Sequence, residues 1–224
     1  MPTERLLVLA SSKKLAGRCL AGISLETGKW VRPVSSLGGE ALGIADCGIE
    51  GRYPRLLEIV RLETLEACPL AHQPENVLIP KQPWLLEPEL APRRVIEILS
   101  DHLEHGPDLL GSTARIFDAQ ACLAAPVKAS LAIVEPQALS LENEQVPWRD
   151  GSRQWAHFRL GGASHSLTIS DFVIGPRLKR KPFGSYRLGD LEIPSIRRPL
   201  ITVSLAGAYD DRHYKLAAAL FGIR

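Results

Sequence analysis

The apolar positions of the chain fall into many short runs, which is typical of β-strands. Residues 5–10 (RLLVLA) form a compact apolar run that ends at two serines, as a buried strand bounded by a turn does. Residues 18–24 and 29–34 follow, separated by the turn Glu26–Gly28. The first 35 residues are therefore predicted to form a three-stranded antiparallel meander.

Residues 55–65 alternate apolar and charged positions, which predicts a further strand with Leu57, Ile59 and Val60 facing inward. Between residues 92 and 103 the spacing changes, because apolar residues recur there every three or four positions among charged ones. This spacing is typical of an amphipathic helix, and Gly106-Pro107 is a stop signal for it. The sequence thus predicts one helix, near residues 93–104, between two β-rich halves.

The second half repeats the pattern of short strands. Its expected strands are residues 131–134, 154–160, 165–169 and 200–205. Residues 214–221 are ambiguous, since their three alanines favour a helix while their position after a strand and a turn favours a closing strand, which is our interpretation. The whole pattern predicts a mainly β protein made of small Greek-key barrels with one or two short helices.

The composition indicates an ordinary folded protein but does not identify what the protein binds. The 224 residues are 45% hydrophobic and 23% charged, as in ordinary folded proteins, and the net charge of +2 is too small to indicate nucleic acid by itself. Four distant cysteines show no spacing typical of a zinc ribbon or a redox dithiol. The chain lacks a signal-peptide pattern and an apolar run of about 20 residues, so we expect a cytoplasmic protein with no membrane partner.

The clearest chemical signal is the segment GKWVRPVS at residues 28–35. Trp30 and Arg32 share one face of a strand, where an indole could stack on a base and a guanidinium could bind a phosphate. Further charge contacts are expected from three neighbouring cations, Lys13, Arg18 and Lys29. The alternative is structural: Trp30 fills the barrel and Arg32 pairs with an internal carboxylate such as Glu58.

Two further segments carry candidate ligand-binding groups. The proline-braced loop at residues 68–76 offers donors and acceptors suited to a base edge, from His72, Gln73 and Asn76. Near residue 180, basic residues alternate with aromatic ones in a mix that suits a nucleic-acid strand; they are Lys179, Arg180, Lys181, Phe183, Tyr186 and Arg187. The structural alternatives are a loop satisfied by its own side chains and an ordinary hairpin tip.

Enzyme chemistry has weaker support in the sequence. Its histidines and acidic residues show no recognised metal-ligand or catalytic-triad spacing, and it lacks a P-loop and a dinucleotide fingerprint. We therefore predict no catalytic residues, no metal and no cofactor. Two rival functions remain open: a small metal-dependent hydrolase or nuclease that uses the His72–Asn76 loop, and a protein-binding adaptor.

Several motifs together resemble the bacterial dual OB-containing domain family. They are LLVLA at residues 6–10, GRCLAG at 17–22, ETGKWVRPVS at 26–35, CPLAHQPEN at 68–76, and the pair VSL at 203–205 and YKLAA at 214–218. The resemblance implies two OB-like barrels, which we assign to residues 1–110 and 111–224. It also implies recognition of nucleic acid or a nucleotide without an established enzymatic activity. Our leading hypothesis is a noncatalytic module of this kind that serves as the sensor part of a larger system. The ligand's identity and the oligomeric state stay open.

Overall fold

The protein is seen in a computed structural model, which describes residues 1–14, 17–146, 151–191 and 198–223. The chain divides into two compact units: Met1–Asp101 with Cys122–Ser130, and His102–Ala121 with Leu131–Arg224. The predicted division between residues 110 and 111 differs from these units, because the chain leaves the first unit after Asp101 and then returns to it. Hydrogen bonds hold the returning segment there, from the main-chain N–H of Val127 to the oxygen of Ala71 and from that of Ser130 to Glu75.

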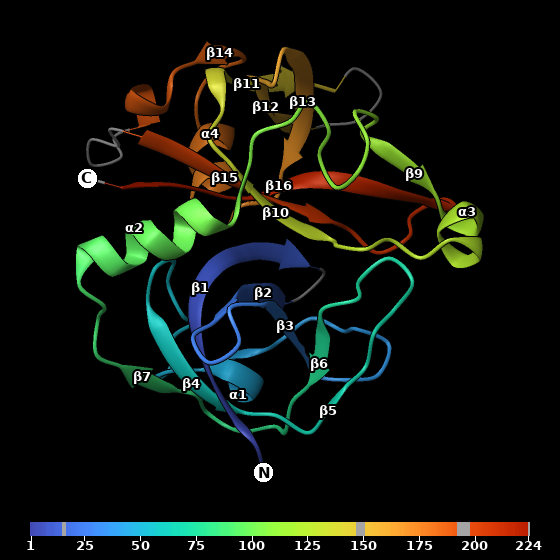
Figure 1. The fold of residues 1–224 in the computed structure, drawn as a ribbon. Coiled ribbons are helices and arrows are strands. Elements are labelled where there is room, and N and C mark those ends of the chain that lie inside the picture. Colours follow the sequence, from blue (N-terminus) through green and yellow to red (C-terminus); the bar gives the residue numbers. More distant parts are fainter. Residues whose placement is uncertain (15–16, 147–150, 192–197, 224) are drawn as a thin grey trace. The chain divides into compact units, whose positions relative to one another are not determined.

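The first unit is a small barrel whose opening meander has the predicted order (Figure 1). Its strands are β1 (Thr3–Lys14), β2 (Gly17–Ser24), β3 (Trp30–Val34), β4 (Ile59–Glu63), β5 (Glu66–Ala67), β6 (Asn76–Leu78) and β7 (Leu85–Glu87), and its helices are α1 (Ile44–Cys47) and α2 (Pro92–Asp101). β1 pairs with both β2 and β4, and β3 pairs in parallel with β6. Because β4 runs on into β5, which pairs with β6, the ring of strands closes on itself.

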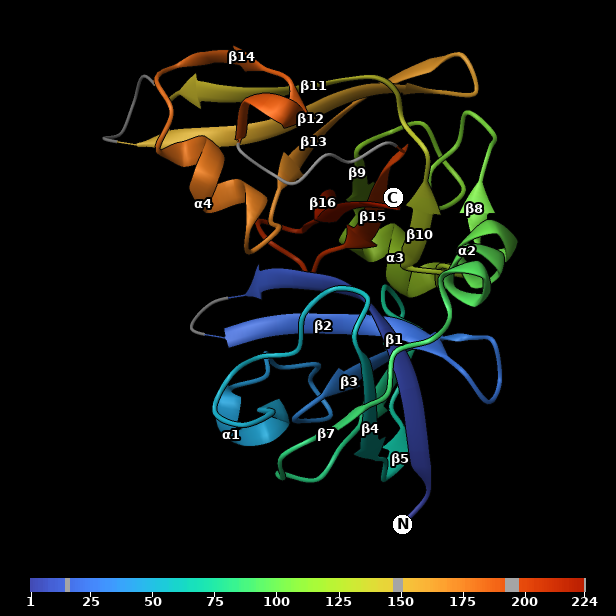
Figure 2. The same ribbon diagram turned by 90° about the vertical axis from the view of Figure 1, so that its left-hand side faces the viewer.

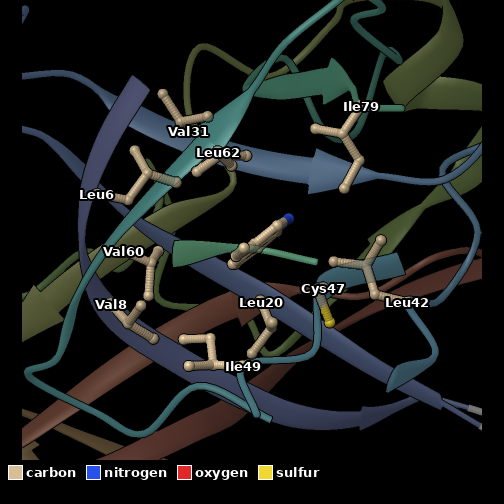
Figure 3. Close-up of a cluster of buried hydrophobic side chains, with 11 residues drawn as sticks. Leu6, Val8, Leu20, Val31, Leu42, Cys47, Ile49, Val60, Leu62 and Ile79 are labelled. Atoms are coloured by element: carbon tan, nitrogen blue, oxygen red, sulfur yellow. The ribbon is translucent and has the colours of Figure 1, made fainter. Parts of the chain in front are cut away.

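The core of the first unit lies inside this ring (Figure 3). Leu6 and Val8 of β1 point into it, as do Val60 and Leu62 of β4. The predicted inward position of Val60 is confirmed. Leu57 was wrongly placed, since it has a positive φ of 68° and precedes the strand, which begins only at Ile59.

The second unit repeats the barrel with a different closure. Its strands are β8 (Leu103–Glu104), β9 (Ile116–Asp118), β10 (Leu131–Val134), β11 (Gln137–Gln145), β12 (Ser152–Leu160), β13 (Ala163–Ile169), β14 (Gly184–Tyr186), β15 (Arg198–Leu205) and β16 (Arg212–Ile223). The ring runs β11-β12-β13-β16-β15-β10, and β10 continues into β11 after Pro136, which closes it. β13 and β16 pair in parallel, the counterpart of β3 and β6 in the first unit.

The other described helices are α3 (Ala119–Ala124), which spans the boundary between the two units in the chain, and, in the second unit, α4 (Ile174–Lys179) and the 3₁₀ turn η1 (Leu188–Leu191). α4 lies between β13 and β15 in the chain and packs against β11 and β12, as Figure 2 shows. β14 then adds to the free side of β11. The turn that links α4 to β14 is therefore anchored at both ends, because α4 packs against β11 and β12 and β14 pairs with β11.

The ambiguous end of the chain is a strand, as we interpreted it. β16 pairs with β15 over most of its length and with β13 in parallel, and its alanines Ala217–Ala219 are buried. Pairing with two neighbouring strands outweighs the modest helix preference of alanine. Among the helices within the described ranges, none combines the length and the apolar character that a bilayer crossing requires.

Candidate functional site

Trp30 and Arg32 do not form the open pair that the sequence predicted. Both lie on the face of β3 opposite the core residue Val31, and Trp30 is half-buried, but Arg32 is only 1% exposed. Its Nη2 donates to Ser130 Oγ at 2.8 Å, and that hydroxyl donates to Glu75 Oε2 at 2.6 Å. The outward side of the strand is thus closed over Arg32 by the returning segment, which the strand pattern alone does not reveal.

The internal carboxylate that we considered for Arg32 has another partner. Glu58 binds Arg52 through two nitrogen–oxygen contacts of 2.9 and 2.8 Å. Burial raises the pKa of Glu58, but the hydrogen bonds from Arg52 and from the Arg55 main chain outweigh it and leave that pKa below its usual value. Arg32 therefore takes a structural role, through Ser130 rather than through Glu58.

The predicted base-reading loop turns two of its amides inward. Gln73 and Asn76 are 2% and 1% exposed, and the Asn76 Nδ2 lies 3.5 Å from the Gln73 Oε1. Main-chain hydrogen bonds between Leu70 and Gln73 close the loop. Only His72 of the three predicted residues stays half-exposed, so the loop does not present the set of donors and acceptors that the prediction required.

Among the remaining predicted cations of the first unit, Lys13 of β1 and Arg18 of β2 lie opposite each other in the strand register. Lys13 and Lys29 are exposed. Arg18 is half-buried, with its Cζ 4.1 Å from the centroid of the Tyr53 ring and its Nη1 donating to Ser11 Oγ at 3.2 Å. These residues do not converge with Arg32 on one binding surface.

The basic segment of the second unit is positioned by Asp171. Its Oδ1 accepts hydrogen bonds from the main-chain N–H groups of Val173 and Ile174, at 2.7 and 2.6 Å, at the entry to α4. Its Oδ2 accepts from the N–H of Leu220 in β16, at 2.8 Å. Asp171 is buried, and this one carboxylate therefore ties the start of α4 to the barrel wall.

The turn that follows α4 is tied down at its far end. The amide of the buried Asn143, on β11, donates to the main-chain oxygens of Lys181 and Pro182, at 2.7 and 3.4 Å. The hydroxyl of Tyr186 also donates to the Pro182 oxygen, at 2.8 Å. Although this turn looks like a free hairpin tip in sequence, its backbone is fixed on the barrel.

Two open pockets meet at this turn. One, of about 500 Å³, is lined by residues of β11, of the start of β12, of the end of α4 and of the turn; they are Asn143, Gln145, Gly151, Ser152, Lys179, Lys181, Pro182 and Phe183. The other, of about 510 Å³, is lined by Arg177, Arg180, Lys181 and Leu191. Lys181 lines both, so the pockets are neighbours, and none of their described lining residues is acidic.

The cations at these pockets are available to a ligand. The side chains of Lys179, Arg180 and Lys181 make no hydrogen bond or ion pair with another described residue. Arg177 donates to the Leu191 main-chain oxygen at 3.1 Å, which holds its guanidinium at the second pocket. Phe183 is 56% exposed and lines the first pocket, so its ring is accessible to a ligand there. Of the residues that the sequence predicted to bind a ligand, Lys179 lines the first of these adjoining pockets and Arg180 the second.

Sequence reasoning missed the contribution of β11. Asn143 and Gln145 precede the basic segment by more than 30 residues, and the packing of α4 and the pairing of β14 against β11 bring them to it. No local pattern marks them.

A second aromatic and basic surface, on β12, was also missed. The Arg115 guanidinium lies 5.3 Å from the ring centroids of both Trp155 and Tyr214, and Trp155 Nε1 donates to Glu144 Oε2 at 2.7 Å. His157 Nε2 lies 2.9 Å from Glu142 Oε2. The alternation of Arg153, Trp155 and His157 along β12 was the available signal. These groups already satisfy one another, so this surface offers a ligand less than the two pockets do.

Within the described residues, no three His, Cys, Asp or Glu side chains gather in a way that could hold a metal ion. The described cysteines are all free thiols, and burial raises the pKa of Cys47 to about 12. What the described lining of the pockets offers is positive charge, an exposed aromatic ring and the carboxamide of Gln145. This combination suits a ligand that is both anionic and aromatic.

Comparison with known proteins agrees with the two-barrel architecture. No curated protein matches the chain. The profile of a family described as the dual OB-containing domain matches residues 4–220, nearly the whole chain. This match confirms the resemblance seen in the sequence motifs and the expectation of two OB-like barrels. The chain belongs to the dual OB-containing domain family.

Proposed function

We propose that this protein is a noncatalytic module that binds single-stranded nucleic acid, or a nucleotide-like ligand, through the two pockets of its second barrel. The observation that carries the proposal is a set of three cations whose side chains make no hydrogen bond or ion pair with a described residue: Lys179, Arg180 and Lys181 line adjoining pockets beside the exposed ring of Phe183. Phosphates supply the negative charge that these cations lack, and bases stack on aromatic rings.

The fixed backbone of the turn supports this assignment. A loop that must become ordered when it binds loses part of its interaction energy to that ordering. Here Asn143 and Tyr186 already hold the turn through the Lys181 and Pro182 oxygens. The cations are therefore presented on a positioned backbone, and only their side chains lose freedom on binding.

Lys13 and Lys29, with the half-buried Trp30, leave a weaker candidate surface on the first barrel. We assign it at most a supporting role, because Arg32 is committed to Ser130 and Gln73 and Asn76 are buried. A cytoplasmic location is part of the proposal, and the free thiols of the described cysteines are consistent with it.

Fluorescence anisotropy with labelled, mixed-sequence single-stranded DNA and RNA tests the proposal over a range of salt concentrations. For single strands, log K falls with log salt by about 0.7 per phosphate contact, so the triple variant Lys179→Ala, Arg180→Ala, Lys181→Ala should lower the slope by about 2. The matched control removes three exposed charges elsewhere: Lys81→Ala, Arg93→Ala and Lys128→Ala. It should retain the wild-type slope.

Two outcomes would overturn the proposal: no salt-dependent binding to either polymer, or equal binding by the two triple variants. Cleavage of the labelled strands in the presence of divalent metal ions would instead support the rival hydrolase or nuclease. A protein partner that stays bound after nuclease treatment, with no affinity for nucleic acid, would support the adaptor.

A further inference from the structure

We infer that the pocket lined by Phe183 binds a nucleobase, with a preference for adenine, and that the pocket lined by Arg180 binds the phosphate of the same nucleotide. This inference rests on the proposed function and adds to it the identity of the ligand unit. The two pockets differ in the chemistry of their walls and share one residue, Lys181.

The described lining of the phosphate pocket is almost entirely cationic. Three of its four described lining residues are Arg177, Arg180 and Lys181, and the fourth is Leu191. Arg177 is held by its hydrogen bond to the Leu191 oxygen, while Arg180 is exposed and makes no hydrogen bond or ion pair with a described residue. A planar guanidinium can bind two oxygens of one phosphate at once.

The base pocket has an apolar wall and an amide. Pro182 and Phe183 form that wall, and Asn143 holds the Lys181–Pro182 segment in place through the oxygens of both residues. Asn143 itself is buried, and its Oδ1 accepts a hydrogen bond from Gln154 Nε2 at 3.0 Å. Its amide is therefore occupied, and it positions the pocket rather than reading a ligand.

Among the other neutral polar side chains described at this pocket, the Ser152 hydroxyl already accepts a hydrogen bond from Gln154 Nε2 at 2.8 Å, and the group left to read the base is Gln145. It lies two residues further along β11, it is exposed, and its carboxamide makes no hydrogen bond with a described residue. A carboxamide offers a donor beside an acceptor, which matches N7 and the N6 amino group of adenine. Stacking on Phe183 accepts any base, so Gln145 is the source of the preference.

Lys181 lies where the base pocket and the phosphate pocket adjoin. A base and its phosphate are joined through a single sugar, so they need adjoining pockets rather than distant ones. Lys181 lines both pockets and can meet the phosphate from the side of the base. Pockets of about 500 Å³ are also within the usual range for small-ligand sites.

The test compares oligo-dA, oligo-dC and an abasic oligomer of the same length, which keeps the phosphates and lacks the bases. Phe183→Ala should weaken the binding of oligo-dA at least fivefold and leave the abasic oligomer unaffected. Gln145→Ala should remove the preference for oligo-dA over oligo-dC. Arg180→Ala should weaken the binding of all three oligomers alike.

Phe183 and Gln145 are exposed, so these variants should keep their fold, which thermal melts will check. Phe183→Trp is the conservative variant and should retain the stacking. The inference is overturned if Phe183→Ala weakens the abasic oligomer equally, or if Gln145→Ala leaves base preference unchanged. If the wild-type protein binds oligo-dA and oligo-dC equally, this inference is wrong but the proposed function stands. If it binds none of the oligomers, the proposed function is wrong as well.

Discussion

Asn143 Nδ2 donates to the main-chain oxygen of Lys181 at 2.7 Å, and this hydrogen bond joins the middle of β11 to the turn after α4. The two residues are 38 positions apart in the chain. Through this contact the wall of the second barrel determines where the cations of the turn lie. The proposed ligand site therefore depends on a buried amide as well as on its own charges.

Replacing that amide should loosen the turn and destabilise the barrel. Asn143→Ala removes the donor to Lys181 and Pro182 and the acceptor for Gln154, so we expect the free energy of unfolding to fall by about 1–3 kcal/mol. Affinity for single-stranded nucleic acid should fall as well. Urea denaturation measures the first effect, with Gln145→Ala on the same strand as the control, expected within about 0.5 kcal/mol of wild type. Equal stability of the two variants would contradict this role for Asn143.

Asp171 should matter more for stability than any other carboxylate near the site. It accepts three main-chain hydrogen bonds, from Val173, Ile174 and Leu220, and it is buried. Asp171→Ala leaves these donors without their acceptor, and we expect it to lower the free energy of unfolding by about 2–4 kcal/mol.

The matched control for Asp171 is Asp190→Ala. The exposed Asp190 accepts a hydrogen bond from the main-chain N–H of Arg187, and its loss should lower the unfolding free energy by less than about 1 kcal/mol. Thermal and urea melts of both variants give the comparison. If Asp171→Ala is no more destabilised than Asp190→Ala, Asp171 is not the anchor of α4.

Arg32 should behave as a structural residue. Arg32→Ala removes the donor to Ser130 Oγ and leaves a buried polar network incomplete, so the unfolding free energy should fall by about 2–4 kcal/mol. The affinity of the folded fraction for nucleic acid should not change. Arg61→Ala is the control, because Arg61 pairs with Glu87 at the surface and should contribute less than about 1 kcal/mol. A loss of affinity without a loss of stability in Arg32→Ala would restore the original prediction for this residue.

Lys215 should make the stability of the protein depend on pH in the alkaline range. This lysine is 0% exposed, its Nζ donates to the Ser112 main-chain oxygen, and burial lowers its pKa to about 8, partly offset by the charges of Asp108 and Glu104. In the unfolded chain its pKa returns to about 10.5, so between pH 8 and 10.5 the unfolded state holds more protons than the folded one.

The sign of the effect follows from that difference. The penalty for burying the charged lysine is fully present below about pH 8 and is relieved as the pH rises toward about 10.5. Lys215→Met removes this titration, so its stability relative to wild type should decline over the same range, by on the order of 3 kcal/mol at most. Urea denaturation of both proteins at pH 7, 8, 9 and 10 measures it. A stability difference that is constant with pH would show that Lys215 titrates normally.

The local pattern of the sequence determined most of the secondary structure. The opening meander, the strand at β10, the β12–β13 hairpin and the closing strand β16 were all predicted, because alternation and turn residues act over a few positions. Lys179 and Arg180 were predicted as candidates from local pattern too, since basic and aromatic residues lie interleaved there within one short segment; their binding role stays a prediction. The two-barrel architecture was predicted from the resemblance of the motifs to the dual OB-containing domain family.

What only the tertiary structure decided is which side chains remain open to a ligand. Strand alternation places Trp30 and Arg32 on the same face of β3. Ser130, which is 98 positions away in the chain, accepts a hydrogen bond from Arg32, and Arg32 is buried. Asn143 and Gln145 reach the basic turn because α4 packs against β11 and β14 pairs with it. Strand alternation determines which face a side chain points to. Whether that face meets solvent or another segment depends on contacts between residues far apart in sequence, which no local pattern contains.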